Sequence, residues 1–436
     1  DVAAAPENET EPALKTRLRV AKKRAALTIA LADISGEWPL EKVTGGLSDL
    51  ASGCLQAACD HCLREAARRG AIVLANPEAP CVQSGLVVLG MGKLGARELN
   101  YSSDIDIILL FDPEVMRTEK PDELQPAMVR LARQMLRIMD ERTVDGYVFR
   151  TDLRLRPDPS ATPLAISVLA AESYYESLGQ NWERAAMIKA RVVAGDEPAG
   201  QLFLKRLTPF VWRKSLDFYA IADIHSIKRQ INAHRSGDGL DLPGHNLKLG
   251  RGGIREIEFF CQTQQLIFGG RSPALRARAT EAALDALVAE QRVEAPVAAR
   301  LKTAYRLLRT IEHRLQMVDD AQTHSLPKDE AAFARVAAFS GFEDPAEFGR
   351  VLLDTLKGVE KAYAELFDDA PGLGTAEGNL VFTGTEDDPD TIETLERMGY
   401  REPSRVVARV REWHRGRVRA TRSGRARRVE APALDC

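Results

Sequence analysis

The clearest pattern of apolar and polar positions lies between residues 86 and 111. Two short apolar runs, 86–89 and 107–111, are rich in Val, Ile and Leu and are bounded by turn residues. Such runs are typical of buried strands. Between them lie a glycine-rich turn at 90–95, GMGKLG, and the segment 102–106, SSDID. We expect the rest of the chain to be arranged around this strand pair.

Helical spacing of apolar residues dominates the rest of the chain. Apolar residues recur at three- and four-residue spacing over residues 14–69, with a break at Ser35 and Gly36, which predicts two or three amphipathic helices. Residues 121–142 are expected to form one helix with Met and Leu on its buried face. From Ser167 onward the pattern is almost wholly helical, with further helices predicted at 217–233 and 300–318.

A third strand is predicted at 149–155. Alternation places Phe149, Thr151, Leu153 and Leu155 on one face and Arg150, Asp152, Arg154 and Arg156 on the other. The charged face is either a surface ladder or a cationic edge that suits phosphate. In the second case, Asp152 supplies a third carboxylate for the strand pair.

These patterns predict an α+β, mostly helical fold with two main parts. A small mixed sheet, built from 86–89, 105–111 and 149–155, is expected to be flanked by helices from 14–69 and 121–142. A separate helical bundle should follow. The predicted segments are a helical segment at 1–80, a catalytic domain at 81–204, a helical bundle domain at 205–368, and a linker with an Arg-rich helix at 369–436.

Composition and charge narrow the classes of partner. Hydrophobic residues make up 44% of the chain and charged residues 28%, as in soluble globular proteins, and a net charge of −3 indicates no partner. The chain has no run of 18 apolar residues and no signal-peptide pattern, so we expect a cytoplasmic protein without a membrane partner. Residues 401–430 carry eleven Arg and three Glu. This leaves nucleic-acid binding as an alternative, but a solvated linker helix is favoured.

Asp104 and Asp106 are candidate metal ligands. On a strand they share one face, while Ile105 and Ile107 point into the core. Two neighbouring carboxylates repel each other unless a cation lies between them. Magnesium takes oxygen ligands and usually combines one or two carboxylates with substrate phosphates. The pair therefore favours a metal site for phosphoryl chemistry, although Asp-Ile-Asp alone also fits a solvated strand entry.

Other interpretations of these motifs remain open. Gly90, Gly92 and Gly95 after a strand also fit a dinucleotide-binding fingerprint, with Asp112 as the acid about 20 residues on, so a Rossmann oxidoreductase ranks second. A Walker A loop is excluded because Leu follows Lys93. Further features have a plain structural alternative: a zinc cluster at Cys54, Cys59, His61 and Cys62, anion binding by the glycine-rich turn at 248–258, and ligand roles for His313 and His324.

Several segments together resemble one known family. Residues 90–111, 149–157, 181–191, 248–259 and 312–327 are similar to the glutamine synthetase adenylyltransferase/adenylyl-removing enzymes of the polymerase-β-like nucleotidyltransferase superfamily. The resemblance covers most of residues 80–330. It implies a polymerase-β-like catalytic domain in which three acids hold two Mg²⁺ ions; the matching positions are Asp104, Asp106 and Asp152.

The resemblance also implies the residues that contact phosphate and nucleotide. The family's phosphate turn matches Gly92 and Lys93, where many relatives have serine in place of the lysine. The positions expected to bind phosphate or nucleotide are Gly92, Lys93, Ser103, Arg154, Arg156, Lys189 and Arg191. The intact acids count against a non-catalytic regulatory module.

The segment 98–106, ELNYSSDID, resembles the adenylyl-removing half of the family. That half implies phosphorolysis of AMP-tyrosine on glutamine synthetase, with phosphate as co-substrate and ADP as product. The alternative is adenylylation from ATP. Residues 378–384 and the Arg-rich tail resemble the linker to a second half, so the chain is expected to be the amino-terminal half. Uridylylated PII, the nitrogen-signalling protein, is the expected regulator, with little requirement for it in this half alone.

Overall fold

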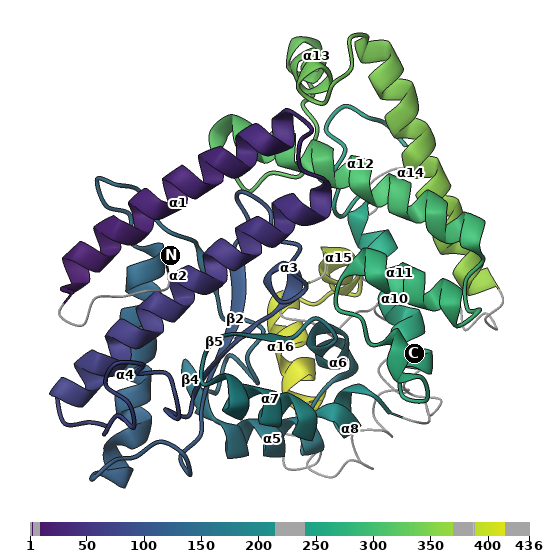
Figure 1. The fold of residues 1–436 in the computed structure, drawn as a ribbon. Helices are drawn as coiled ribbons and strands as arrows, with labels where there is room; N and C mark the ends of the chain where they lie inside the picture. The colour runs from purple at the N-terminus through teal and green to yellow at the C-terminus, as the bar shows by residue number, and fades with distance from the viewer. Residues whose placement is uncertain (1, 3–8, 214–239, 369–386, 388, 415–436) are drawn as a thin grey trace.

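The structure is a computed structural model that describes residues 2, 9–213, 240–368, 387 and 389–414 (Figure 1). The predicted helix at 217–233, the segment 378–384 and the end of the Arg-rich tail lie outside these residues. None of the helices in the described ranges is long and apolar enough to cross a membrane.

Five described strands form one small mixed sheet. They are β1 (Leu86–Gly90), β2 (Ile105–Phe111), β3 (Thr151–Asp152), β4 (Ala165–Ser167) and β5 (Arg191–Gly195). β1 pairs antiparallel with β2 and β5, while β2 pairs parallel with β3 and β4. With the surrounding helices, this sheet confirms the predicted α+β fold. The Rossmann interpretation is wrong, because it requires β1 and the next strand to be parallel.

Three parts of the sheet differ from the prediction: β3 is shorter than expected, and β4 and β5 were not expected. The strand expected at 149–155 is only two residues long, because Asp152 Oδ1 accepts a hydrogen bond from Arg154 N at 2.7 Å and turns the chain out of the sheet. The almost wholly helical pattern after Ser167 missed β5. Val192 pairs with Leu89 and Ala194 with Val88 at the free edge of β1, a tertiary contact that overrides the local pattern.

The alternation of β2 divides the core around the sheet into two clusters. Ile105, Ile107 and Leu109 are buried with apolar residues of α1 (Glu11–Ile34), α2 (Leu40–Arg68) and α4 (Pro121–Asp140). Ile108 and Leu110 are buried with residues of a second helical layer. That layer consists of α5 (Val168–Ser177), α6 (Asn181–Met187), α7 (Glu197–Arg206) and α8 (Thr208–Val211). Figure 1 shows α1 and α2 running side by side across the molecule.

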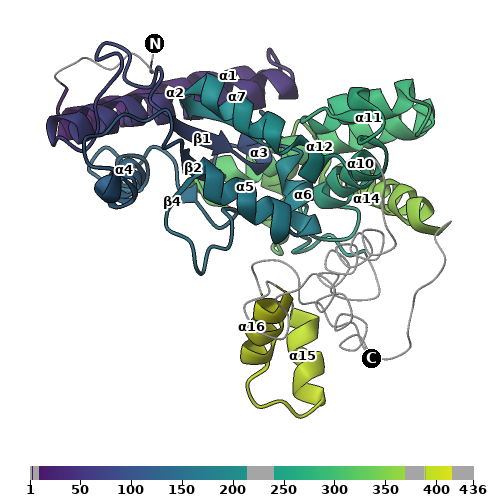
Figure 2. The same ribbon diagram turned by 90° about the horizontal axis from the view of Figure 1, so that it is seen from below.

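Helices α10 to α14 share a third core, built around residues such as Leu308, Ile311 and Phe348. They are α10 (Ile254–Phe268), α11 (Thr280–Ala289), α12 (Ala295–Asp319), α13 (Glu330–Phe339) and α14 (Pro345–Asp368), with a short 3₁₀ turn at Pro273–Leu275. We call α10–α14 the helical group; it lies beside the sheet layers (Figure 2). The exact domain boundaries stay a prediction. A small pair, α15 (Pro389–Arg397) and α16 (Pro403–His414), packs through Leu395, Val407 and Val410.

The short helix α3 (Gly92–Gly95), which follows β1, has no room for a side chain at its last residue, Gly95. A Cβ atom on Gly95 would lie 2.0 Å from the carbonyl oxygen of Lys189 and 2.4 Å from that of Gly90. Both neighbours are backbone atoms, so neither contact is relieved by a rotamer change. The glycine turn is therefore locked against the chain segment that leads into β5.

We expect Gly95→Ala to lower the free energy of unfolding by about 3 kcal/mol or more, because backbone must move to admit the methyl group. The matched control is Gly358→Ala, in the middle of α14, where an added Cβ meets nothing within 4 Å. That substitution should stabilise the protein by about 0.5–1 kcal/mol through helix propensity. Denaturant unfolding of both variants checks this, and an unchanged Gly95→Ala midpoint would contradict the packing.

Candidate functional site

Two of the three predicted carboxylates are direct neighbours in the sheet. In the parallel ladder of β2 and β3, Asp106 is the partner of Asp152. Asp104 comes just before β2 and shares the side of Asp106, because alternate residues of an extended chain share a face. Ile105 and Ile107 point the other way, into the first core, as predicted. The fold thus gathers acids from two distant segments at one end of β2.

The carboxyl group of Asp106 is costly to ionise. Burial raises its pKa from 3.8 to about 6, and the negative charges of Asp152 and Asp104 act in the same direction. The cations Lys248 and Arg154 oppose this rise. The position therefore favours either a bound proton or a bound cation.

Gly92 lets the backbone of the turn lie close to this carboxylate. Its φ angle is 49°, in the left-handed region that favours glycine, and a Cβ atom there would lie 2.9 Å from Asp106 Oδ2. A side chain at this position would press on the carboxylate. Glycine at position 92 therefore allows the close approach of the turn and Asp106.

Arginines neutralise the other two carboxylates. Arg150 Nε donates to Asp104 Oδ1 at 2.6 Å, and Arg150 Nη1 donates to the Tyr147 hydroxyl at 2.9 Å. Arg154 Nε donates to Asp152 Oδ2 at 2.8 Å. These ion pairs partly neutralise the negative charge of Asp104 and Asp152.

The case for a metal ion rests on the kind of oxygen ligands that the site offers. It does not rest on a complete coordination shell. Among the described residues, no three His, Cys, Asp or Glu side chains form a group that could hold a metal ion as they stand. Asp106 and Asp152 nevertheless offer adjacent hard oxygen donors of the kind that Mg²⁺ prefers. The pKa of Asp106 is raised by burial and by the like charges nearby, so a bound cation would stabilise its ionised carboxylate. Metal binding stays a prediction, and it requires the two arginines to release their carboxylates.

Two predicted phosphate-binding lysines are engaged with acids inside the protein. Lys93 Nζ donates to both carboxylate oxygens of Glu312, at 3.0 and 3.2 Å, and burial lowers the Lys93 pKa to about 8 in spite of that pair. Lys189 Nζ donates to Glu98 at 3.0 Å and to Glu258 at 2.6 Å. Burial alone would raise the pKa of Glu258, but the Lys189 charge outweighs it and holds that pKa at about 2.

The remaining predicted residues also make contacts within the fold. Arg191 Nη2 donates to the carbonyl oxygen of Leu94 at 3.1 Å, and Arg156 Nη1 donates to that of Leu153 at 2.9 Å. Ser103 is buried in the segment before β2. In this structure these side chains support the turns around the site, and their roles toward phosphate stay predictions.

Helix α12 is docked on the segment that joins the glycine turn to the aspartates. Arg309 Nη2 donates to the carbonyl oxygen of Glu98 at 2.6 Å and also to Asn100 Oδ1. Ser102 N donates to Gln316 Oε1 at 2.9 Å. The helical group therefore fixes the backbone just before the carboxylates.

Glu312 is a residue of the site that was not predicted from the sequence. Its carboxylate is fully buried between Lys93 and Arg309, and His324 Nδ1 lies 2.7 Å from it in poor hydrogen-bond alignment. Its place in a predicted helix was visible, but nothing in that helix showed that it would reach residue 93. His313 and His324 make polar contacts within the protein, as expected; His313 lies 3.2 Å from both Asp33 and Asn100.

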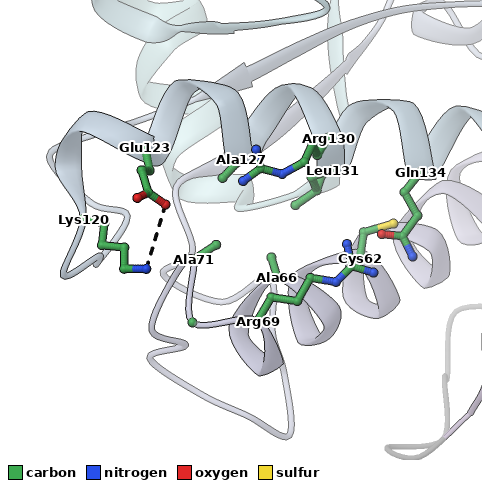
Figure 3. Close-up of a pocket in the computed structure, with 11 residues that line it drawn as sticks. Cys62, Ala66, Arg69, Ala71, Lys120, Glu123, Ala127, Arg130, Leu131 and Gln134 are labelled. Carbon is green, nitrogen blue, oxygen red and sulfur yellow. Dashed lines mark ion pairs between the residues drawn. The ribbon is translucent and has the colours of Figure 1, made fainter.

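Two hollows of the described surface lie away from the carboxylates. A cavity of about 70 Å³ between α2 and α4 is lined by Cys62, Arg69, Arg130 and their neighbours, with an ion pair of 3.9 Å between Lys120 and Glu123 (Figure 3). A more open cleft of about 450 Å³ lies at the end of α2. Neither contains a predicted site residue, so the carboxylates and not these hollows define the candidate site.

The zinc alternative finds no support in the described residues. Cys54, Cys59, Cys62 and Cys81 are buried free thiols, and no metal-holding group includes them. Cys59 Sγ lies 3.5 Å from Met135 Sδ, in the core between α2 and α4. The cysteines are helix-packing residues, as the sequence favoured.

Comparison with known proteins agrees with the family resemblance. Residues 2–206 match a family model described as glutamate-ammonia ligase adenylyltransferase, and residues 225–367 match one described as GlnD PII-uridylyltransferase. Relatives named bifunctional glutamine synthetase adenylyltransferase/adenylyl-removing enzyme are 56% identical in Rhizobium meliloti (strain 1021) and 54% in Agrobacterium fabrum. These matches cover 95% and 96% of this chain but only 42% of each relative. A relative of the same name from Caulobacter vibrioides is 50% identical over 98% of the chain and 44% of its own length.

We expect Asp106→Asn to raise the free energy of unfolding of the metal-free protein at pH 8 by up to about 3 kcal/mol. The folded-state pKa of about 6 lies above the unfolded value of 3.8, so folding favours the protonated carboxyl. The stability that the protonated Asp106 carboxyl contributes is fully present below the unfolded pKa of 3.8. It is lost as the pH rises through the folded pKa of about 6.

The gain from Asp106→Asn should therefore shrink to about half when the pH is lowered from 8 to 5. Urea unfolding in EDTA at both pH values measures it, with Asp354→Asn, an exposed position on α14, as the control. A gain of equal size at the two pH values would show that ionisation of Asp106 is not its cause.

Proposed function

Over the length that it shares with them, the chain belongs to the family of bifunctional glutamine synthetase adenylyltransferase/adenylyl-removing enzymes, and we propose that its carboxylate site removes AMP from adenylylated glutamine synthetase. The reaction is phosphorolysis of the AMP-tyrosine bond. An oxygen of inorganic phosphate bonds to the α-phosphorus, the bond from that phosphorus to the tyrosyl oxygen breaks, and the phosphate proton ends on the tyrosine. The products are ADP and free tyrosine.

The observation that carries this proposal is the direct pairing of Asp106 with Asp152 beside the backbone of the glycine turn at Gly92. Phosphoryl transfer needs little covalent chemistry from the protein and depends on positioning and on neutralising charge. A carboxylate pair next to this turn supplies a place where phosphate oxygens and their counter-ions can meet.

Asp106, Asp152 and Asp104 are the residues that would hold Mg²⁺. Bound there, the ions would neutralise phosphate charge and align the attacking and leaving oxygens. The protein's own contribution is to present the three acids from one end of β2 and to keep Arg150 and Arg154 within reach of them. These arginines neutralise the acids when no cation is present and become available to phosphate when one is.

Removal of AMP is favoured over its addition by the resemblance of residues 98–106 to the adenylyl-removing half of the family. Adenylylation from ATP is the second candidate, because the relatives' names include both activities. The same type of carboxylate site serves either direction of transfer, so an assay must distinguish them.

Uridylylated PII is the proposed regulator. Residues 225–367 match a family model whose description contains a PII-modifying enzyme, and those residues include the helical group that contacts the site. A regulator that binds this group would act on the segment before the carboxylates. Its effect requires different affinities for two states of the enzyme.

The test is to mix the chain with adenylylated glutamine synthetase, Mg²⁺ and phosphate, and to measure ADP. A second arm offers ATP labelled at the α-phosphate to unmodified synthetase, and a third repeats the first with PII-UMP. ADP formation without label transfer supports removal. Label transfer without ADP formation would replace the proposal by adenylylation, and neither product would refute both.

We expect Asp152→Asn and Asp104→Asn each to reduce ADP formation at least about 100-fold, because either change removes a charge that the metal site needs. The fold should survive, because Asn keeps a side-chain oxygen that can accept the hydrogen bonds now donated by Arg150 and Arg154. Circular dichroism checks the fold, and Asp354→Asn on α14 is the control for activity. Full activity of Asp152→Asn would remove it from the site.

A further inference from the structure

The second glycine-rich turn, at 248–258, places the cation Lys248 near the carboxylate site, just before the first helix of the helical group. Near Asp106, Arg154 is paired with Asp152, and Lys93 is paired with Glu312. The half-buried ammonium group of Lys248 has no hydrogen bond or ion pair to any residue in the described ranges. It is therefore open to a ligand from outside the chain.

Backbone pairing places Lys248 beside the buried acid of α12. Leu247 N donates to the carbonyl oxygen of His324 at 2.8 Å, and Leu326 N donates to that of His245 at 2.9 Å. The imidazole of His324 lies against Glu312, which holds Lys93. The contacts run from Leu247 to His324, from His324 to Glu312, and from Glu312 to Lys93. The start of the second glycine-rich turn therefore lies close to the first glycine turn, although the two are distant in sequence.

The conformation of the turn is held from both of its ends. Asn246 Oδ1 accepts hydrogen bonds from Lys248 N and Leu249 N, both at 2.9 Å. Gly252 has φ 69°, and a Cβ atom there would lie 2.1 Å from the carbonyl oxygen of Leu356. The backbone of Lys248 is thus fixed before any ligand arrives, which lowers the entropy cost of using its side chain.

The charge of Lys248 acts on Asp106 and on Lys93, which lie on either side of Gly92. It stabilises the Asp106 carboxylate more strongly than Arg154 does, and it repels the Lys93 ammonium. A cation that lies near another cation and makes no ion pair of its own favours an anion between them. The nearby acid Glu312 is already shared by Lys93 and Arg309.

We infer that Lys248 binds a phosphate group of the substrate, either the attacking inorganic phosphate or the adenylyl phosphate, from the helical-group side of the site. This role rests on the proposed phosphorolysis. In that reaction the attacking phosphate becomes the β-phosphate of ADP. Lys248 would offset charge on oxygens that Lys93, held by Glu312, does not reach alone.

Lys248→Met should weaken ADP binding about ten-fold in isothermal titration calorimetry with EDTA at low salt, while Lys248→Arg keeps most of it. Lys248→Gln repeats the loss of charge with a polar side chain. The control is Lys357→Met, a lysine exposed on α14 in the same helical group. In the phosphorolysis assay, the Lys248→Met variant should raise one KM by a similar factor. That is the KM for phosphate if Lys248 binds the attacking phosphate, and the KM for adenylylated synthetase if it binds the adenylyl phosphate.

AMP titrations identify which phosphate is bound. Loss of ADP affinity with AMP affinity unchanged assigns Lys248 to the attacking phosphate, and loss of both assigns it to the adenylyl phosphate. ADP binding by folded Lys248→Met and Lys248→Gln within two-fold of wild type would overturn the inference. Lys248-dependent ADP binding in a wild type that makes no ADP would instead refute the proposed reaction and support the phosphate site.

Discussion

The buried ion pair between Lys93 and Glu312 is the constraint on which the arrangement of the site depends. Glu312 is fully buried, and an isolated charge there would be very costly, so α12 must lie where Lys93 can reach it. Removing one partner of such a pair typically costs about 3–5 kcal/mol, because the other charge is left without compensation. The glycine turn and the helical group consequently cannot take their places independently.

A second buried pair applies the same constraint from another helix. Lys189, just before β5, is held by Glu98 from the segment after the glycine turn and by Glu258 from α10. Glu98 also accepts a hydrogen bond from the backbone N–H of Thr280 at 2.6 Å. Two helices of the helical group are therefore tied to the short stretch between the turn and the aspartates. A shift of that group would be felt at the carboxylates.

Local pattern was enough to predict the parts of the site that depend on neighbours in sequence. The alternation of Ile105, Asp106 and Ile107 gives the correct face of β2, and Gly92 stands where only glycine fits. What the sequence could not show depends on contacts between distant segments. Lys189 looks like a free cation in sequence, but the fold buries it between two acids. The five-residue strand β5 exists because β1 offers it an edge.

These long-range contacts also explain why so many cations of the predicted phosphate site are already occupied. A site that brings several positive side chains together before substrate arrives must balance their repulsion, and buried acids such as Glu312 and Glu258 do so. The balance holds Lys93 and Lys189 in place but reduces the charge that they offer to phosphate. In the proposed phosphorolysis, selectivity for a phosphate dianion would then depend on cations that make no ion pair within the described residues. Lys248 is one of them, and its turn is held against α12 through His324.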